Sequence, residues 1–380
     1  DELVLAAQKP SRYVGLEFGA VKKDLADARL RFALAFPDTY EVGMSNLGFQ
    51  WVFRLLNRED DVSCERFFFD EADLAGRGPR TLESETPLGA FPLVAFSISW
   101  EMDYVHFLRI LPAARIPLDR RERGEGDPIV LVGGDCARIN PLPLTPYVDA
   151  FAMGDGEKLV PGIADVLRAE LPRAAALERL AALKGLYVPA VHGEQAEGAD
   201  EGKVVVDQLR AAEGATREPP HTTILTPHTE LSDKLLIEIA RGCSEMCRFC
   251  WAAYAMAPQV RVPASSILAV AERCRPLTSR VGLIATAVAD HPEILPILDG
   301  LSSLGFHIAL SSIKIDAISE ELLAVLARQG EKSLSIAPEA GNERLRRAIN
   351  KKVSDAMLRE KVRLVARAGF TNLKLYLQVG

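Results

Sequence analysis

The sequence predicts an α/β protein made of two successive series of alternating strands and helices. In both halves of the 380-residue chain, short apolar segments alternate with amphipathic segments that have the period of a helix. Residues 171–230 separate the two series and contain polar, glycine- and proline-rich stretches. We therefore expect an N-terminal domain over residues 1–170, a linker with a short helix and a hairpin over 171–230, and a C-terminal domain over 231–380.

The N-terminal series suits a doubly wound sheet, which binds ligands at the carboxyl ends of its strands. The residues that directly follow each strand are therefore candidate site residues. The expected strands are Leu30–Phe36, Cys64–Phe69, Leu93–Ser97, Ile129–Val132 and Asp149–Met153, and the expected helices are Ser45–Leu56, Met102–Leu111 and Glu157–Glu170.

The C-terminal series is typical of a parallel barrel, in which the loops after the strands build the active site. Five βα units are visible, and the chain stops at Gly380 directly after the fifth strand. We therefore expect the barrel to be truncated there and the chain to be a fragment of a longer protein. The expected strands are Leu235–Ala240, Val281–Thr286, Phe306–Ser312, Lys332–Ala337 and Asn372–Gln378, and the expected helices are Pro263–Cys274, Pro292–Leu304, Ile318–Arg328, Asn342–Ile349 and Asp355–Ala368.

Three cysteines, Cys243, Cys247 and Cys250, follow the first barrel strand within eight residues. Three thiolates can bind three irons of a [4Fe–4S] cluster, whereas an ordinary electron-transfer cluster takes four cysteine ligands. A cluster with three protein ligands keeps one iron open, and an open coordination position allows metal chemistry. The spacing C-x3-C-x2-C therefore predicts a cluster that takes part in catalysis.

Other uses of cysteine fit the sequence less well. A structural zinc site takes four Cys or His ligands, usually from two closely spaced pairs, and no second pair follows the first. A disulfide framework is typical of short secreted chains. The remaining cysteines occur singly, so we interpret Cys64, Cys136 and Cys274 as small apolar side chains of the interior.

The cysteine run, with Phe249 directly before the last cysteine, resembles the signature of the radical S-adenosylmethionine (SAM) enzymes. The resemblance implies a partial (β/α)6 barrel with the three cysteines in the loop after its first strand. It also implies that the methionyl amine and carboxylate of SAM bind the open iron. The backbone beside Phe249 would face the adenine.

The later strand ends would supply further SAM contacts under this resemblance. The second strand of the superfamily often ends in Gly-Gly-Glu, which pairs with the methionyl amine, but here it ends in Ala285, Thr286 and Ala287. Ser311, Ser312 and Glu339 would contact ribose or amino-acid groups. Glu339 could instead cap the helix that begins near Asn342.

His291 is a weak candidate for acid–base work, because it stands beside Asp290 directly after the second barrel strand. It could equally mark the start of the following helix. No other catalytic residue is identified.

A second motif follows three strands of the N-terminal series. In order and spacing it resembles the cobalamin-binding motif Asp-x-His-x-x-Gly, then Ser-x-Leu or Ser-x-Thr, then Gly-Gly. Glycine lets a corrin or nucleotide tail approach the backbone. The alternative is an α/β domain with ordinary turn glycines. The matching residues are Asp38, Tyr40 and Gly43 after the first strand, Ser97 and Ser99 after the third, and Gly133 and Gly134 after the fourth.

One departure from the cobalamin motif matters for its chemistry. The histidine that would ligate cobalt is replaced by Tyr40, and a phenol with a pKa near 10 is a poor ligand at neutral pH. The resemblance therefore implies cobalamin without a protein nitrogen ligand below the cobalt. The wider sequence is similar to an uncharacterised branch of cobalamin-binding-domain radical SAM proteins, in the segments FPDTYEVGMSNLGFQWVFRLLN, FSISWEMDY, GGDCARINPLPL, MGDGEKLV and SIAPEAGNERLRRAINK.

Together these resemblances imply an enzyme that cleaves SAM to a 5′-deoxyadenosyl radical and uses cobalamin as a methyl carrier to methylate an unactivated carbon. A rearrangement or cyclisation would use the same residues. A non-catalytic iron–sulfur or cobalamin-binding module is the alternative from another class, favoured by the missing Gly-Gly-Glu. A methylthiotransferase is disfavoured, because its N-terminal domain would bring three further cysteines and only Cys64 and Cys136 are present there.

The composition of the chain indicates which classes of partner to expect. No apolar run is long enough to span a bilayer, so we expect no membrane partner. The formal net charge of −7 disfavours a non-specific nucleic-acid surface without excluding nucleic acid. Clustered thiols favour the reducing cytoplasm. The expected cofactors are the cluster, SAM and cobalamin, and the expected partner is an external one-electron reductant of flavodoxin or ferredoxin type.

Overall fold

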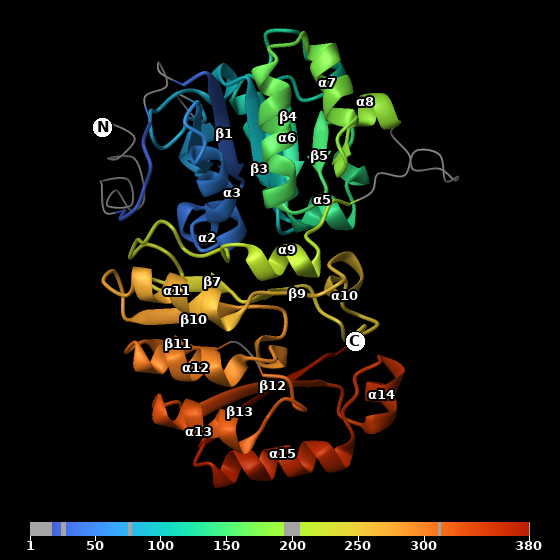
Figure 1. Ribbon diagram of the computed structural model, residues 1–380. Helices are drawn as coiled ribbons and strands as arrows, with labels where there is room; N and C mark the ends of the chain where they lie inside the picture. Colours follow the sequence, from blue (N-terminus) through green and yellow to red (C-terminus); the bar gives the residue numbers. More distant parts are fainter. Residues whose placement is uncertain (1–16, 24–27, 75–77, 194–205, 311–312, 380) are drawn as a thin grey trace. The chain divides into compact units, whose positions relative to one another are not determined.

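The computed structural model describes residues 17–23, 28–74, 78–193, 206–310 and 313–379. They form two compact units, shown in blue to green and in yellow to red in Figure 1. The first unit comprises Asp1–Leu209 and Thr223–Ser232, and the second comprises Arg210–Thr222 and Asp233–Gly380. Both units are α/β, which confirms the predicted fold class.

The first unit contains a six-stranded sheet with the strand order β2-β1-β3-β4-β5-β6. All neighbours are parallel except the last pair, in which β6 is antiparallel to β5. The order 2-1-3-4-5 is that of flavodoxin-like doubly wound folds, which bind ligands where the strand order reverses. The strands are β1 (Leu30–Phe36), β2 (Val62–Phe68), β3 (Leu93–Ser97), β4 (Ile129–Gly133), β5 (Ala150–Ala152) and β6 (Leu186–Tyr187).

Alternate residues of β1 supply the two faces of this sheet. Phe32 and Leu34 pack with α3 and α6 on one face, and Ala33 and Ala35 pack with α4 on the other. Two elements that the sequence placed in the linker, α7 and β6, contribute to the core of this unit. The helices are α2 (Tyr40–Gly43), α3 (Leu47–Asn57), α4 (Asp103–Ala113), α5 (Asp135–Ile139), α6 (Gly156–Arg168), α7 (Arg173–Ala181) and α8 (Pro189–His192). The expected hairpin at Lys203–Gln208 lies partly outside the described residues.

The second unit is a succession of parallel strands joined by helices. Strands β7, β10 and β11 form one sheet and β12 and β13 another. An isolated parallel bridge pairs Ile313, which follows β11, with Ile336 of β12. Within the described residues no pairing returns from β13 to β7, so the barrel is open, as a partial barrel requires. The strands are β7 (Leu235–Glu238), β8 (Ala240–Arg241), β9 (Val260–Arg261), β10 (Arg280–Ile284), β11 (His307–Ala309), β12 (Ser333–Glu339) and β13 (Asn372–Leu377).

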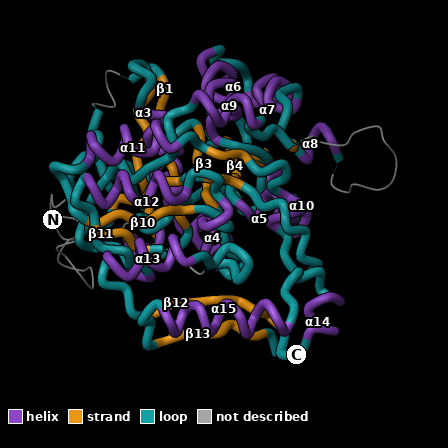
Figure 2. Tube along the Cα trace, turned by 60° about the horizontal axis from the view of Figure 1, so that its bottom comes forward, coloured by secondary structure: helices purple, strands orange, loops and turns teal. Residues whose placement is uncertain are grey.

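Helices of this second unit cover the strands through one apolar core. Figure 2 shows α15 lying along β12 and β13, where Val365 packs with Leu334 and Ile336. None of the helices in the described residues is long and apolar enough to cross a membrane. The helices are α9 (Ala211–Thr216), α10 (Ala252–Ala255), α11 (Ala264–Cys274), α12 (Ile294–Ser303), α13 (Glu320–Arg328), α14 (Glu343–Ala348) and α15 (Asp355–Arg367).

Candidate functional site

The loop that carries the three cysteines is closed at its base by a two-stranded ribbon. Strand β8 pairs antiparallel with β9, so the two ends of the segment between these strands lie side by side. Gly242 makes the first turn, with a positive φ of 82°. A Cβ atom there would lie 2.1 Å from the carbonyl oxygen of Met256, so only glycine fits directly before Cys243. We call residues 242–251 the cysteine loop.

A segment about one hundred residues further along holds the cysteine loop in place. The backbone N–H of Arg248 donates to the carbonyl of Ile349 at 3.0 Å, and its guanidinium donates to that of Ala348 at 2.7 Å. The amide of Asn350 donates to the carbonyl of Met246 at 2.8 Å. Both Met246 and Asn350 have positive φ, which is uncommon for residues other than glycine and is concentrated at functional sites.

Cys243, Cys247 and Cys250 line one cavity of about 190 Å³. Among the described residues, no three His, Cys, Asp or Glu side chains converge as a single bound metal ion would require. A structural zinc ion takes four protein ligands, whereas the cysteine loop supplies three cysteines. Three thiols lining one cavity are the ligand number that leaves one iron of a [4Fe–4S] cluster without a protein ligand.

Burial and neighbouring charges in the cavity shift the pKa of the Cys247 thiol. Burial raises the pKa of its thiol, while the nearby ammonium of Lys351 lowers it and the other two thiols raise it. A cluster ligand must be a thiolate. Lys351 is therefore a residue of this chain that favours the ligand form of Cys247.

The cavity brings together three of the residues expected to contact SAM. Phe249, Thr286 and Glu339 line it along with the cysteines. Ala285 packs instead against the apolar core. Ser311 and Ser312 lie outside the described residues.

Glu339 does not cap the helix that follows it. The cap of α14 is Asn342, whose side-chain oxygen accepts a hydrogen bond from the N–H of Leu345 at 2.9 Å. Glu339 has a positive φ of 67°, and its carboxylate lies 3.4 Å from the ammonium of Lys351. A carboxylate and an ammonium are thus side by side in the cavity, and the strained backbone at Glu339 is of the kind found at ligand sites.

Sequence reasoning missed Lys314, which lies in the same cavity. Its ammonium donates to Glu245 at 2.9 Å and to Asp290 at 2.8 Å, and lies 3.4 Å from Asp316. Burial disfavours the charged ammonium, but the hydrogen bonds to Asp290 and Glu245 outweigh it and raise the pKa of Lys314. The only sequence signal is a single lysine between Ile313 and Ile315.

His291 is buried at the start of α12. Its Nε2 atom contacts the carbonyl of Val262 at 2.9 Å, and its Nδ1 atom accepts from the N–H of Glu293 at 3.1 Å. These partners assign the proton to Nε2. Burial lowers the pKa of the ring, so it stays neutral. Nδ1 contacts the start of α12 and Nε2 contacts the segment before α11. Asp290, not His291, reaches the Lys314 cluster.

The carboxyl ends of β1, β3 and β4 lie next to one another in the first unit. Ser97, Gly133 and Gly134 line a mainly apolar cavity of about 110 Å³ there. Gly134 has a φ of 98°, and a Cβ atom on it would lie 2.5 Å from the carbonyl oxygen of Ile98. Gly134 is therefore required by the close approach of the backbone at Ile98, whereas Gly133 makes no such contact and lies beside the apolar recess.

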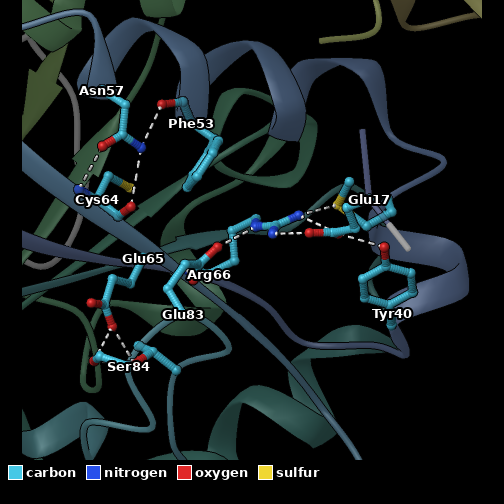
Figure 3. A network of polar contacts seen from close by, with 11 residues as sticks. Glu17, Tyr40, Phe53, Asn57, Cys64, Glu65, Arg66, Glu83 and Ser84 are labelled. Carbon is cyan, nitrogen blue, oxygen red and sulfur yellow. Dashed lines mark hydrogen bonds and ion pairs between the residues drawn. The ribbon is translucent and has the colours of Figure 1, made fainter. Parts of the chain in front are cut away.

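The remaining residues of the expected cobalamin set lie outside the lining of this cavity. Asp38 accepts from the N–H of Thr39, Ser99 accepts from Asn46, and Gly43 packs under the ring of Phe68. Tyr40 is buried, and its hydroxyl donates to Glu17 at 2.5 Å. Figure 3 shows this phenol directed at Glu17.

Glu17 belongs to a buried ionic network that sequence reasoning did not find. The guanidinium of Arg66 donates to both oxygens of Glu17, at 2.8 and 2.6 Å, and its Nε atom donates to Glu83 at 2.6 Å (Figure 3). Burial and the charge of Glu17 raise the pKa of Tyr40. Its hydroxyl is therefore a neutral donor within the network.

A buried carboxyl lies at the start of α4, after the end of β3. Asp103 is 3% exposed, and burial together with the charge of Asp38 raises its pKa from 3.8 to about 6. Because the folded-state pKa is the higher one, the folded protein holds this proton more tightly. The resulting stability is complete below about pH 4 and is lost as the pH rises through about 6.

We therefore expect the melting temperature of Asp103→Asn, relative to that of wild type, to be higher at pH 8 than at pH 5. The reason is that the amide cannot ionise in the buried position. Thermal melting of wild type and variant at both pH values checks this. Glu320→Gln, an exposed carboxyl in the first turn of α13, is the matched control and should leave the pH dependence unchanged. If the melting temperatures of wild type and D103N changed with pH in parallel, the raised pKa of Asp103 would be contradicted.

The N-terminal and C-terminal parts of the chain each match the model of a known protein family. Residues 48–189 match "Radical SAM proteins, N-terminal", and residues 237–380 match "Radical SAM superfamily". The chain is also 25% identical over 350 residues to the uncharacterized protein MJ0966 of Methanocaldococcus jannaschii, a match that covers 92% of this chain and 69% of the relative.

Solved structures with the same fold include two radical SAM enzymes with bound cobalamin. OxsB, solved with aqua-cobalamin and SAM bound, superposes with a TM-score of 0.62 at 14% identity, over 92% of this chain and 49% of that one. The methyltransferase TsrM from Kitasatospora setae, solved with cobalamin and a [4Fe–4S] cluster, gives a TM-score of 0.60 at 13% identity, over 92% and 69%. The chain thus spans about half the length of OxsB, and at these identities the likeness establishes the fold.

Proposed function

Because the chain carries the N-terminal and core domains of the radical SAM superfamily, we propose that it is a cobalamin-dependent radical SAM methyltransferase. The observation that carries the proposal is the single cavity shared by Cys243, Cys247, Cys250, Thr286 and Glu339. When bound, a reduced [4Fe–4S] cluster supplies the electron that cleaves SAM to methionine and a 5′-deoxyadenosyl radical, and cobalamin supplies a methyl group for the substrate. We place this chemistry in the cytoplasm, where thiols stay reduced.

The residues of the second unit would bind and orient SAM. Cys243, Cys247 and Cys250 would hold the cluster through three thiolates, and the methionyl amine and carboxylate of SAM would bind beside them. Glu339 and Lys351 offer opposite charges within the same cavity, as a zwitterionic amino-acid group requires. Lys314 fixes the positions of Glu245 and Asp290, so it connects the cysteine loop to the loop after β10.

The first unit would bind cobalamin at the carboxyl ends of β1, β3 and β4. The recess beside Ser97, Gly133 and Gly134 suits a flat apolar ring. The hydroxyl of Tyr40 is engaged by Glu17, so we expect Tyr40 to support the structure of this unit rather than to ligate cobalt. The cobalamin bound in OxsB and TsrM supports the same assignment by fold.

Anaerobic reconstitution of the full-length protein with iron, sulfide and cobalamin tests the proposal. After addition of SAM and a chemical reductant, nucleosides are quantified by mass spectrometry. A methyltransferase should form 5′-deoxyadenosine and S-adenosylhomocysteine together, and only with cobalamin present. 5′-Deoxyadenosine alone would point to a rearrangement or cyclisation enzyme, or to uncoupled turnover in the absence of the substrate. Neither product, from protein with an intact cluster, would identify a binding module.

Gly133→Val should separate the two cofactor sites. Gly133 lines the cavity of the first unit, and a Cβ atom on it would make ordinary contacts with Ala152, so the branched side chain fills the recess without backbone strain. We expect cobalamin binding, followed by absorption of the bound corrin, to fall at least about tenfold, as occluding a formed pocket does. Iron content should be unchanged. Equal cobalamin affinity in wild type and variant would place the cofactor elsewhere.

A further inference from the structure

A strongly basic segment borders the cysteine loop. Residues 341–353 carry Arg344, Arg346, Arg347, Lys351 and Lys352 against a single acid, Glu343, in a chain whose formal net charge is −7. Arg346 is buried and donates to the carbonyls of Ala340 and Val353, so it shapes the segment from inside. A local excess of one sign on a protein of the opposite sign points to a partner of complementary charge.

The excess charge faces outward. Arg347 has a side-chain exposure of 77% and pairs with Glu343 on the same helix, and Lys352 has a side-chain exposure of 66%. Arg248 and Arg344 are also exposed. We call these four residues, Arg248, Arg344, Arg347 and Lys352, the basic rim.

Hydrogen bonds place the basic rim beside the thiols. Arg248 lies between Cys247 and Cys250 in the sequence and binds the carbonyl of Ala348, one residue after Arg347. In Figures 1 and 2, α10 and α14 lie toward the same side of the second unit. The rim is therefore anchored to the loop that would hold the cluster.

Apolar side chains in the cysteine loop and in α10, directly after it, are exposed. Met246, Phe249, Trp251 and Tyr254 are between 38% and 55% exposed. Cys247 and Cys250 are half-buried beside them, so the thiols come close to the surface here. Aromatic and methionine side chains surrounded by charged residues are the usual composition of a protein–protein interface.

We propose that this surface docks an acidic one-electron donor of flavodoxin or ferredoxin type. The donor loses one electron and the oxidised cluster gains it, with no bond made or broken and no proton transferred. Redox encounters use small, weak interfaces, and opposite charges raise their association rate and set their orientation. The inference rests on the proposed function, because it assumes a cluster held by the three cysteines.

The surface favours a protein over a nucleic acid. Affinity for nucleic acid comes mainly from phosphate contacts along an extended basic groove. Here the basic residues form one short segment, and the exposed apolar side chains lie beside the thiols rather than along a groove.

The double variant R344E/R347E tests the proposal in the full-length, cluster-loaded protein. Its matched control is R328E/R367E, which makes the same change in net charge with exposed residues of α13 and α15. The probe is an acidic flavodoxin, and its dissociation constant is measured by titration at about 10 mM ionic strength, where the Debye length is about 30 Å. We expect R344E/R347E to bind at least about tenfold more weakly than wild type and the control to bind as wild type does. At about 1 M salt, where the Debye length is about 3 Å, the difference should disappear.

Reduction of the cluster gives a second readout. Dithionite should reduce wild type and R344E/R347E equally, whereas reduced flavodoxin should reduce the variant more slowly. A neutral variant, R344Q/R347Q, should be intermediate. Iron content and circular dichroism establish that each variant is folded and loaded.

The outcomes separate the two proposals. Equal flavodoxin affinity in wild type and R344E/R347E would overturn the docking surface, as would a loss confined to binding of a single-stranded RNA oligonucleotide. Failure of dithionite-reduced wild-type protein to cleave SAM would overturn the proposed function alone, because flavodoxin binding is measured without turnover.

Discussion

Replacement of Cys247 by alanine is expected to abolish both cluster assembly and SAM cleavage. The thiol lies in the middle of the cysteine loop and shares the cavity with the other two cysteines. With two ligands remaining, two of the four irons would have no protein ligand. Loss of an outer-shell partner alone costs a metal site about 10–100-fold, so loss of a direct ligand should lower SAM cleavage by more than about 100-fold.

The measurements are iron content, the absorption of the reconstituted cluster, and 5′-deoxyadenosine formed after reduction. Cys274→Ala is the matched control, since Cys274 lies on α11 outside the cavity lining. It should keep full iron and full activity. A C247A protein that retained stoichiometric iron would show that the cluster is bound elsewhere.

Replacement of Arg66 by methionine is expected to lower the free energy of unfolding of the first unit by about 3–5 kcal/mol, the usual cost of removing one partner from a buried ion pair. The Arg66 side chain is 1% exposed, and its partners Glu17 and Glu83 are 12% and 6% exposed. Burial raises the pKa of Glu83 even with the guanidinium in place. Without Arg66 both carboxylates would be buried without their counter-charge, so the loss should be larger at pH 8 than at pH 5.

Chemical denaturation in a Trp251→Phe background measures this change, because the two tryptophans that remain, Trp51 and Trp100, belong to the first unit. Arg109→Ala is the control: its pair with Glu71 is exposed at the surface, and its loss should leave the unfolding transition unchanged. The triple variant R66M/E17Q/E83Q should recover part of the loss, because it also removes the two charges. A transition for R66M that coincides with wild type would mean that water already solvates the network.

The strands were predictable where an apolar run is bounded by turn residues. Strands β1 and β3 have the predicted bounds, since Leu30–Phe36 and Leu93–Ser97 are buried on both faces. Strand β6 was missed because its two residues, Leu186–Tyr187, are too few to show a period. It forms only because β5 offers an edge to pair with.

The cysteines were predictable because the ligands of the cluster are adjacent in sequence. Lys314 was not, because its partners Glu245 and Asp290 come from two other loops and meet it only in the folded unit. The same holds for Tyr40, whose partner Glu17 belongs to a segment 23 residues earlier. In each case the chemistry depends on contacts between segments that no local pattern encodes.

The hydrogen bond from Asn350 to Met246 has a consequence for biogenesis. It spans 104 positions of the chain and fixes a loop whose thiols are all synthesised before residue 251. Contacts of long sequence separation form late, because the intervening loop must close first. The three thiols therefore reach their final geometry only after four of the five parallel strands have been made, so iron loading is a late step in the maturation of this unit.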